Sequence, residues 1–179
     1  MKSTVIDHLA LWLASTIVLA ACGGDHPGHG QSVETTGKEA TGLAAVPAEV
    51  LRAARDARPE LQIDSAEHEV RNGQEYYDIA GKMPDGSELE LDMTTVDGGW
   101  AVVEIQQDVS MADIPDRARQ ALSSANPDWV PTRIIESDQG DGVIIYEFFL
   151  GPGAGAAETK VEVKWENGAA EVLRDEWVH

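Results

Sequence analysis

Cysteine is nearly absent from this chain of 179 residues, in which Cys22 is the only one. A lone cysteine cannot form a disulfide within the chain, so the fold must rest on its hydrophobic core. Basic residues are also scarce: 13 Lys and Arg stand against 32 Asp and Glu, and the formal net charge is -19. Such a surface repels nucleic-acid phosphates and favours cations or basic proteins. The same charge also keeps an exported protein soluble, and that reading is the simpler one.

Long apolar runs are missing except near the N-terminus, where residues 9–19 are almost wholly apolar. This run is too short to span a bilayer as a mature helix, and with Lys2 before it and small residues after it the pattern predicts an export signal over residues 1–21. The small pair before Cys22 resembles a bacterial lipobox, which implies acyl chains on Cys22 and a membrane anchor. Gly23 in place of Asp implies the outer membrane, facing the periplasm. An ordinary signal peptide with a stray cysteine is the alternative.

Residues 22–45 are rich in Gly, Thr and charged side chains and contain no aromatic residue. Such a segment cannot bury enough apolar surface to offset the entropy of ordering, so we expect a flexible tether. His26 and His29 lie close together beside Asp25. A structural zinc site needs four ligands, and no others are apparent, so a solvated linker is favoured over a metal site. We expect no metal and no cofactor.

Two segments share one layout. Val46-Pro47 opens the first and Pro59 closes it, while Ile114-Pro115 opens the second and Pro127 closes it. Proline suits the first turn of a helix, and apolar residues follow at helical spacing. Each segment therefore predicts a short helix that must dock on another element to be stable.

Alternating apolar residues and Asn-Gly or Asp-Gly turns follow each predicted helix, as in β-hairpins. In the first half, Leu89, Leu91 and Met93 lie on one face of a strand and acids on the other. The pattern predicts an α+β fold of two tandem repeats, residues 46–109 and 110–179, each with one helix and a three- to four-stranded antiparallel sheet. The expected strands are 67–71, 75–81, 87–94, 100–105, 133–136, 143–150, 159–165 and 169–173.

The Val-Pro and Ile-Pro helix entries, the proline at each exit, the strands that carry Tyr77 and Tyr146 and the glycine hairpins resemble the PepSY-like group of bacterial envelope proteins. That group is similar to the halves of the beta-lactamase inhibitory protein, in which tandem units form a curved sheet whose concave face grips an enzyme. The resemblance implies a protein-binding or inhibitory module, and no catalytic residue can be carried over from it.

Aromatic side chains are the candidates for contact with an envelope or secreted protein, because Tyr and Trp anchor many interfaces. Most aromatic residues in small domains nonetheless belong to the core. The candidates are Trp129 in first place, then Tyr77, Tyr146, Trp100 and Trp165, with Tyr76 and Trp177 also considered. The glycine-rich loop 151–157 is a second candidate contact.

No cluster of residues indicates a reaction. Ser65, Glu67 and His68 are too close in sequence for the geometry of a nucleophile and its base, and no oxyanion donor is evident. Residues 136–149 resemble a calcium loop only superficially, because glycines occupy ligand positions and Phe149 stands where Glu is needed. We therefore expect a non-catalytic, lipid-anchored protein-binding or inhibitory module. The alternative is an acidic cation-binding or envelope-stress-responsive periplasmic module.

Overall fold

The computed structural model describes residues 35–125, 127–150 and 159–177. The export signal, Cys22, the His26–His29 pair and the loop 151–157 all lie outside these residues. Within the described part of the chain, neither helix has the length and hydrophobicity needed to cross a membrane.

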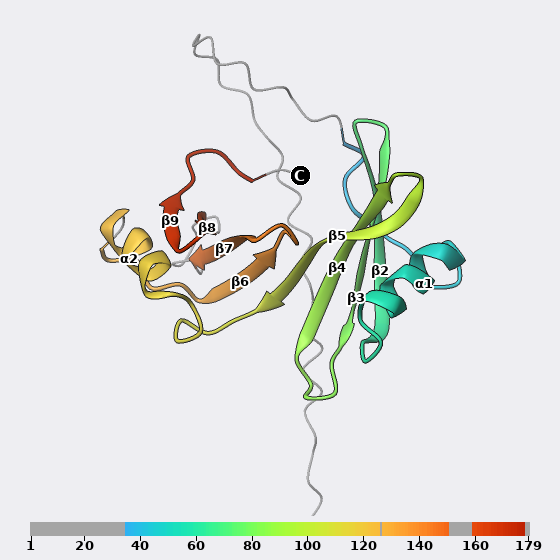
Figure 1. The fold of residues 1–179 in the computed structure, drawn as a ribbon, viewed down its shortest axis with the longest axis horizontal. Coiled ribbons are helices and arrows are strands. Elements are labelled where there is room, and N and C mark those ends of the chain that lie inside the picture. Colours follow the sequence, from blue (N-terminus) through green and yellow to red (C-terminus); the bar gives the residue numbers. More distant parts are fainter. Residues whose placement is uncertain (1–34, 126, 151–158, 178–179) are drawn as a thin grey trace, which may run out of the picture.

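All strands of the described residues form one antiparallel sheet in which their order along the chain is also their order in space. Along the chain, α1 comes between β1 and β2, and α2 comes between β5 and β6. In space, α1 and α2 lie at opposite ends of the sheet (Figure 1). The elements are β1 (Glu39–Ala40), α1 (Ala48–Ala57), β2 (Gln62–Arg71), β3 (Gln74–Lys82), β4 (Glu88–Val96), β5 (Gly99–Asp108), α2 (Asp116–Ala125), β6 (Arg133–Asp138), β7 (Val143–Leu150), β8 (Thr159–Glu166) and β9 (Ala169–Val172).

The prediction of two helix-plus-sheet repeats is wrong, although both helices and most strands lie where the sequence places them. The exceptions are β1, which was not expected, and β2, which begins at Gln62 where the expected strand began at 67. Strands make up 50% of the described residues and helices 15%, and the strands form a single nine-stranded sheet. The join is made by β5, whose residues Ile105–Asp108 pair with Ile135–Asp138 of β6. A free strand edge presents unpaired N–H and C=O groups, and the pairing of β5 with β6 satisfies them across the boundary between the expected repeats.

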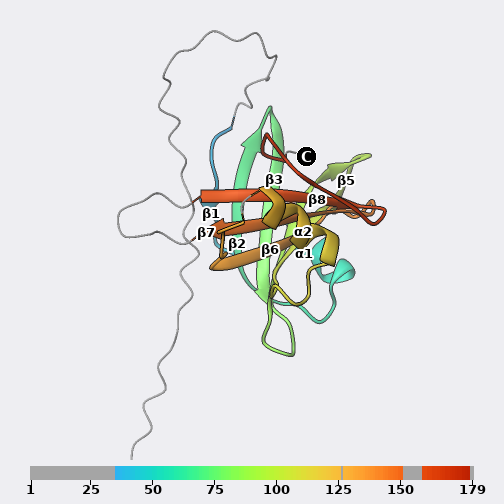
Figure 2. The same cartoon turned by 90° about the vertical axis from the view of Figure 1, so that its left-hand side faces the viewer.

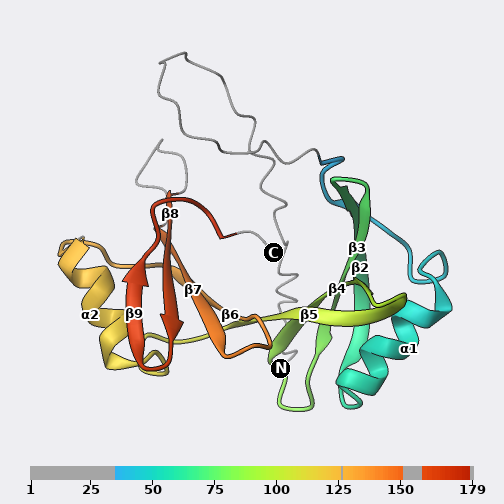
Figure 3. The ribbon, with the colours of Figure 1, turned by 45° about the horizontal axis from the view of Figure 1, so that its top comes forward.

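Each helix covers the same face of the sheet at a different end. Val50 and Ala54 of α1 are fully buried in a cluster with Ile79, Leu91 and Met93. Figure 3 shows α1 and α2 on the outer sides of the two ends, with the sheet curving between them. Strands β6–β8 run steeply across the direction of β2 and β3 (Figure 2), as accumulated right-handed twist produces.

A second cluster of buried residues lies under α2. Ala118 and Leu122 of this helix pack with Phe148, which has no exposed surface, and with Ile134 and Val163. Successive residues of a strand point to opposite faces, so the residues between these apolar positions lie on the other side of the sheet. We call that other side the polar face.

Residues 35–45, part of the segment expected as a tether, lie along the outer edge of β2. The Thr36 N–H donates to the Val70 carbonyl at 3.0 Å, and the Thr41 N–H donates to the Ala66 carbonyl at 2.8 Å. Leu43 packs against the cluster under α1. We call residues 35–45 the strap, since they cover an edge that would otherwise be open.

Replacing Gly81 with Ala is expected to lower the free energy of unfolding by about 2 kcal/mol, because an added methyl group overpacks the β2–β3 contact. A Cβ at Gly81 would lie 2.2 Å from the carbonyl oxygen of Gln62, where β2 has an irregularity between Ile63 and Ser65. Urea unfolding measures the loss. Gly42→Ala is the control, since its Cβ meets nothing within 4 Å; equal effects of the two changes would contradict this account.

Candidate functional site

A row of acidic side chains crosses the polar face. Glu67 of β2 lies opposite Asp78 of β3, Asp78 lies opposite Asp92 of β4, and Asp92 lies opposite Glu104 of β5. We call these four residues the acidic row. Like charges directly opposite each other destabilise a sheet, so the acidic row lowers the stability of the fold.

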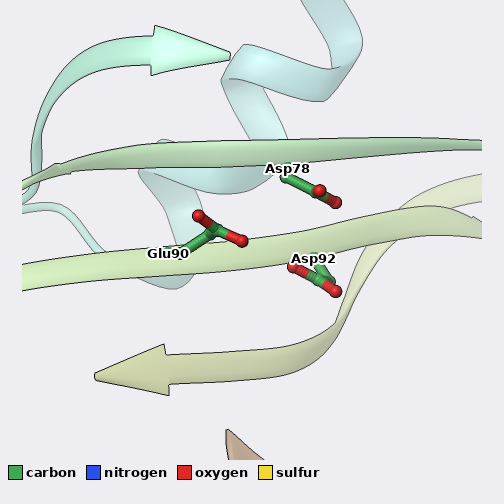
Figure 4. Close-up of side chains that lie close together, drawn as sticks. All are labelled: Asp78, Glu90 and Asp92. Atoms are coloured by element: carbon green, nitrogen blue, oxygen red, sulfur yellow. The ribbon is translucent and has the colours of Figure 1, made fainter. Parts of the chain in front are cut away.

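Three carboxylates converge where the row crosses β3 and β4. One oxygen each of Asp78, Glu90 and Asp92 lies within 4.8 Å of the other two, and Figure 4 shows the three side chains gathered over neighbouring strands. Asp78 is 4% exposed and Asp92 is 3% exposed. We call these three residues the carboxylate cluster. Two of its three carboxylates are buried and that of Glu90 is partly exposed, and the alternation of Glu90 and Asp92 with apolar residues in β4 brings them to one face.

A cation from the strap reaches the carboxylate cluster. The Lys38 Nζ lies 2.5 Å from Oδ2 of Asp78 and 3.8 Å from Oε1 of Glu90. Burial acts to lower the pKa of Lys38, but the surrounding Asp78, Asp92 and Glu90 raise it further, so the net shift is upward and the side chain stays charged. In the described part of the chain, Lys38 is the one cation found in an ion pair with the cluster. One positive charge therefore faces three carboxylates.

The excess negative charge raises the affinity of the cluster for protons. Burial, and then the neighbouring Asp78, raise the pKa of Glu90 to about 7, although Lys38 opposes the shift. Burial also raises the pKa of Asp92 well above its ordinary value, with Asp78 and Glu104 adding to the effect. A buried carboxylate that lacks a cation avoids the cost of its charge by holding a proton.

One oxygen of Asp92 lacks a hydrogen-bond partner among the described residues. Its Oδ1 is fully buried and accepts no hydrogen bond from any described residue. A buried carboxylate oxygen without a donor is costly, and most such groups in proteins are satisfied. Asp92 is therefore the least satisfied member of the cluster.

The raised pKa of Glu90 predicts that the protein without bound metal ions loses stability as the pH rises. Glu90 has a folded pKa of about 7 against an ordinary 4.5, so between these values the folded chain binds more protons than the unfolded chain. The free energy of unfolding should fall by on the order of 2 kcal/mol from about pH 4.5 to about pH 7.5, allowing for the partial exposure of Glu90. The groups that act on Glu90 are Asp78, Lys38, Glu67 and Glu104.

Urea unfolding with a chelator present, at several pH values, measures this slope. Glu90→Gln is the control, because it removes the titrating group and retains a similar shape. The slope should be smaller in Glu90→Gln than in the wild type. Identical slopes in the two proteins would show that another group causes the dependence.

A second polar network continues the polar face toward the C-terminal strands. Gln139 donates to Oε1 of Glu104 at 3.1 Å and accepts the indole N–H of Trp177 at 2.9 Å. The backbone N–H of Trp177 donates to Glu162, whose Oε1 lies 2.8 Å from the Nζ of Lys160. The acidic row is thus linked through hydrogen bonds to the far half of the sheet.

The aromatic residues proposed as partner contacts mostly lie in or against the core. Tyr77 and Tyr146 are buried, and Trp100 packs edge-on against Tyr77 with ring centroids 5.3 Å apart. Trp129 and Trp165 are half-buried against the cluster under α2. Trp177, which was only a secondary candidate, is the tryptophan that the hydrogen-bond network places on the polar face.

The residues considered for catalysis are not brought together. Glu67 lies on the polar face, whereas His68 stacks against Tyr77 on the other face, with ring centroids 4.7 Å apart. Ser65 is exposed and donates to Asp64. A cleft of about 440 Å³ between the end of α1 and the β3–β4 hairpin is lined by mixed charged and apolar side chains. Ser87 in its lining donates its hydroxyl and its backbone N–H to Asp85, at 2.6 Å and 2.9 Å, so this pair caps the β3–β4 turn.

The acids of the supposed calcium loop act as turn caps. Asp138 accepts the backbone N–H of Gly140 at 2.9 Å, and Asp141 accepts that of Val143 at 3.0 Å. Glu136 accepts a hydrogen bond from Gln107 at 2.9 Å. These three acids have separate partners, as expected for a hairpin.

No family model, no curated protein and no solved structure matches this chain. The site therefore has to be interpreted from its own geometry. Sequence reasoning missed Asp78 and Lys38 as members of a cluster. The only available signal was the position of Asp78 between two apolar-face residues, Tyr77 and Ile79, which is the same alternation that the strand at 87–94 shows.

Proposed function

We propose that this protein is a non-catalytic, lipid-anchored envelope module that binds a basic protein partner through the polar face of its sheet. The observation that carries the proposal is the sidedness of the sheet. Among the described residues both helices cover one face, and the other face carries no helix. Instead it carries carboxylates on β2 to β5, β7 and β8, which are Glu67, Glu69, Asp78, Glu90, Asp92, Glu104, Glu147 and Glu162. Beside them Ile135, Val143 and Ile145 are buried on β6 and β7.

The basic side chains of the polar face do not neutralise it. Arg71 pairs with Glu69 at 3.1 Å, and Lys160 pairs with Glu147 at 3.3 Å and with Glu162. Arg71 is thus engaged by one acid and Lys160 by three, the third being Glu176. Among the ion pairs of the described residues, the acidic row has Lys38 as its cation. A surface with this excess of carboxylates favours Lys- or Arg-rich partners by charge complementarity. The PepSY-like resemblance supports the same face, since it implies that the concave side of the sheet grips a protein.

The proposed attachment to the membrane rests on the N-terminal sequence. The lipobox-like residues before Cys22 support lipidation, and acyl chains would hold the module at the membrane surface. Cys22→Ala is expected to move the protein from the membrane pellet to the soluble fraction. Mass spectrometry of the wild-type N-terminal peptide should find acyl chains on Cys22. A wild-type protein that fractionates as soluble would remove this part of the proposal.

Binding is tested by comparing two double variants of equal charge. Glu67→Gln with Glu147→Gln changes the polar face, and Glu49→Gln with Asp116→Asn changes exposed acids on the two helices. Proteins captured from envelope extract by the wild type are identified, purified and titrated by calorimetry at about 50 mM and about 300 mM salt.

The expected result is a basic partner whose affinity falls with salt and falls further in the polar-face variant, while the helix variant binds like the wild type. A partner that binds both double variants equally well would place the interface elsewhere. A captured protein with an acidic contact surface would exclude charge complementarity as the basis of binding.

A further inference from the structure

We propose that the carboxylate cluster of Asp78, Glu90 and Asp92 is a calcium site for which Lys38 of the strap competes. The proposal does not depend on the protein-binding function. Its starting point is that the buried carboxylates outnumber the cationic side chains that contact them. Three carboxylates converge, Glu104 lies directly opposite Asp92, and one ammonium group is in contact.

The separations within the cluster fit calcium. Calcium binds oxygen ligands at about 2.3–2.6 Å, so ligands on opposite sides of the ion lie roughly 4.6–5.2 Å apart. One oxygen from each of the three carboxylates lies within 4.8 Å of the other two, so small rotations of the side chains would bring all three into contact with one ion. Carboxylates that bind through both oxygens, together with water, can complete the six to eight ligands that calcium takes.

The chemistry of the ligands narrows the choice of metal. The cluster offers only carboxylate oxygen, with no imidazole and no thiolate, and therefore suits hard cations over zinc or copper. Magnesium demands ligands at about 2.0–2.1 Å and usually retains several waters, so a buried set of protein carboxylates suits it less well than calcium.

The second, independent observation is the orphaned oxygen of Asp92. This side chain is 3% exposed, and its Oδ1 has no hydrogen-bond partner among the described residues. Asp92 is itself a member of the convergent set, so the unsatisfied oxygen belongs to a carboxylate that would hold the ion. A bound cation would supply the partner that the folded chain does not.

Lys38 lies where a cation would bind, with its Nζ 2.5 Å from Asp78 and 3.8 Å from Glu90. Its side chain is 38% exposed, so it can turn outward without unfolding the sheet. Calcium and the Lys38 ammonium group therefore compete for the same oxygens. Occupancy of the site would release the side chain of Lys38 and loosen the hold of the sheet on the strap.

The test is calorimetric titration of the full chain in detergent with calcium chloride, after treatment with a chelator. The wild type should show one saturable site per chain, and magnesium chloride should bind at least tenfold more weakly. Asp92→Asn, which retains the shape of the side chain, should lose at least tenfold in calcium affinity. Lys38→Met should bind calcium more tightly, by about threefold or more, because the competitor is gone.

Asp138→Asn is the matched control, since Asp138 belongs to the hairpin that superficially resembles a calcium loop, and it should bind calcium like the wild type. Circular dichroism confirms that each variant is folded, and calcium should raise the melting temperature of the wild type more than that of Asp92→Asn. Absence of saturable heat in the wild type, wild-type affinity in Asp92→Asn, or loss of affinity in Asp138→Asn would overturn the proposal. Equal affinity for magnesium would overturn the choice of calcium.

Discussion

Lys38→Met is expected to lower the free energy of unfolding by about 3 kcal/mol at about pH 7.5 with a chelator present. The change leaves Asp78, which is 4% exposed, beside Asp92 with no ammonium group to balance them. Removing one partner of a buried ion pair costs about 3–5 kcal/mol, and the partial exposure of Lys38 favours the lower end of this range. Urea unfolding measures the loss. Met preserves much of the apolar stem, so the effect reports the charge.

Lys82→Met is the matched control for Lys38. Lys82 pairs with Glu88 at 3.8 Å, and its side chain is 56% exposed, so its loss should cost less than about 0.5 kcal/mol. The cost of Lys38→Met should also shrink at about pH 5, where the carboxylates of the cluster take up protons. If the two lysine variants lost equal stability, Lys38 would be an ordinary surface cation.

Phe148→Ala is expected to lower the free energy of unfolding by about 3–5 kcal/mol, because it removes a ring from a closed core. Phe148 has no exposed surface and packs with Ile134 and Val163 of the sheet and Leu122 of α2. The short helix α2 depends for its stability on packing against this hydrophobic cluster, so its movement into the cavity would not restore the lost contacts. Chemical denaturation followed by circular dichroism measures the change.

The neighbouring Phe149 supplies the control for Phe148. It is half-buried on the opposite side of β7, where Arg133 lies over its ring at 5.7 Å from the centroid. Phe149→Ala should cost about 1 kcal/mol, since partly exposed side chains leave no closed cavity. A cost as large as that of Phe148→Ala would mean that Phe149 is packed as tightly as Phe148.

Much of the local structure could be predicted from the sequence. The prolines at 47 and 115 mark the starts of α1 and α2, and Asn72, Asp97 and Asn167 occupy turns with positive φ. These are local signals, since they depend on the allowed backbone angles of a residue and on spacing along one element. The alternation around Leu91 also placed acids on one face of β4 and apolar residues on the other.

The number of sheets and the role of residues 35–45 could not be predicted in the same way. Pairing of β5 with β6 joins segments across an intervening helix, and two repeated halves in sequence are equally compatible with one sheet or two. The strap was assigned to a tether because its composition is polar. Its order comes from backbone hydrogen bonds to the edge of β2, which composition does not encode.

The aromatic candidates show why a list of residue types does not define a site. Tyr77 and Tyr146 were chosen as partner contacts for their chemistry, yet alternation within β3 and β7 turns both toward the helices. Trp177 reaches the polar face only because the chain after β9 folds back over Gln139 and Glu162. Side-chain direction within a strand follows the register, and the register is set by pairing with other strands.

By itself the sequence determined the helices, the strands, the turns between them and the acidic character of the chain, since each follows from neighbours a few residues apart. Only the tertiary structure decided that Lys38, Asp78, Glu90 and Asp92 meet. Their meeting depends on the register of β2 with β3 and of β3 with β4, and on the strap lying along the edge of β2. Register describes how two paired strands are aligned, so it is known only once the strands are paired in the sheet.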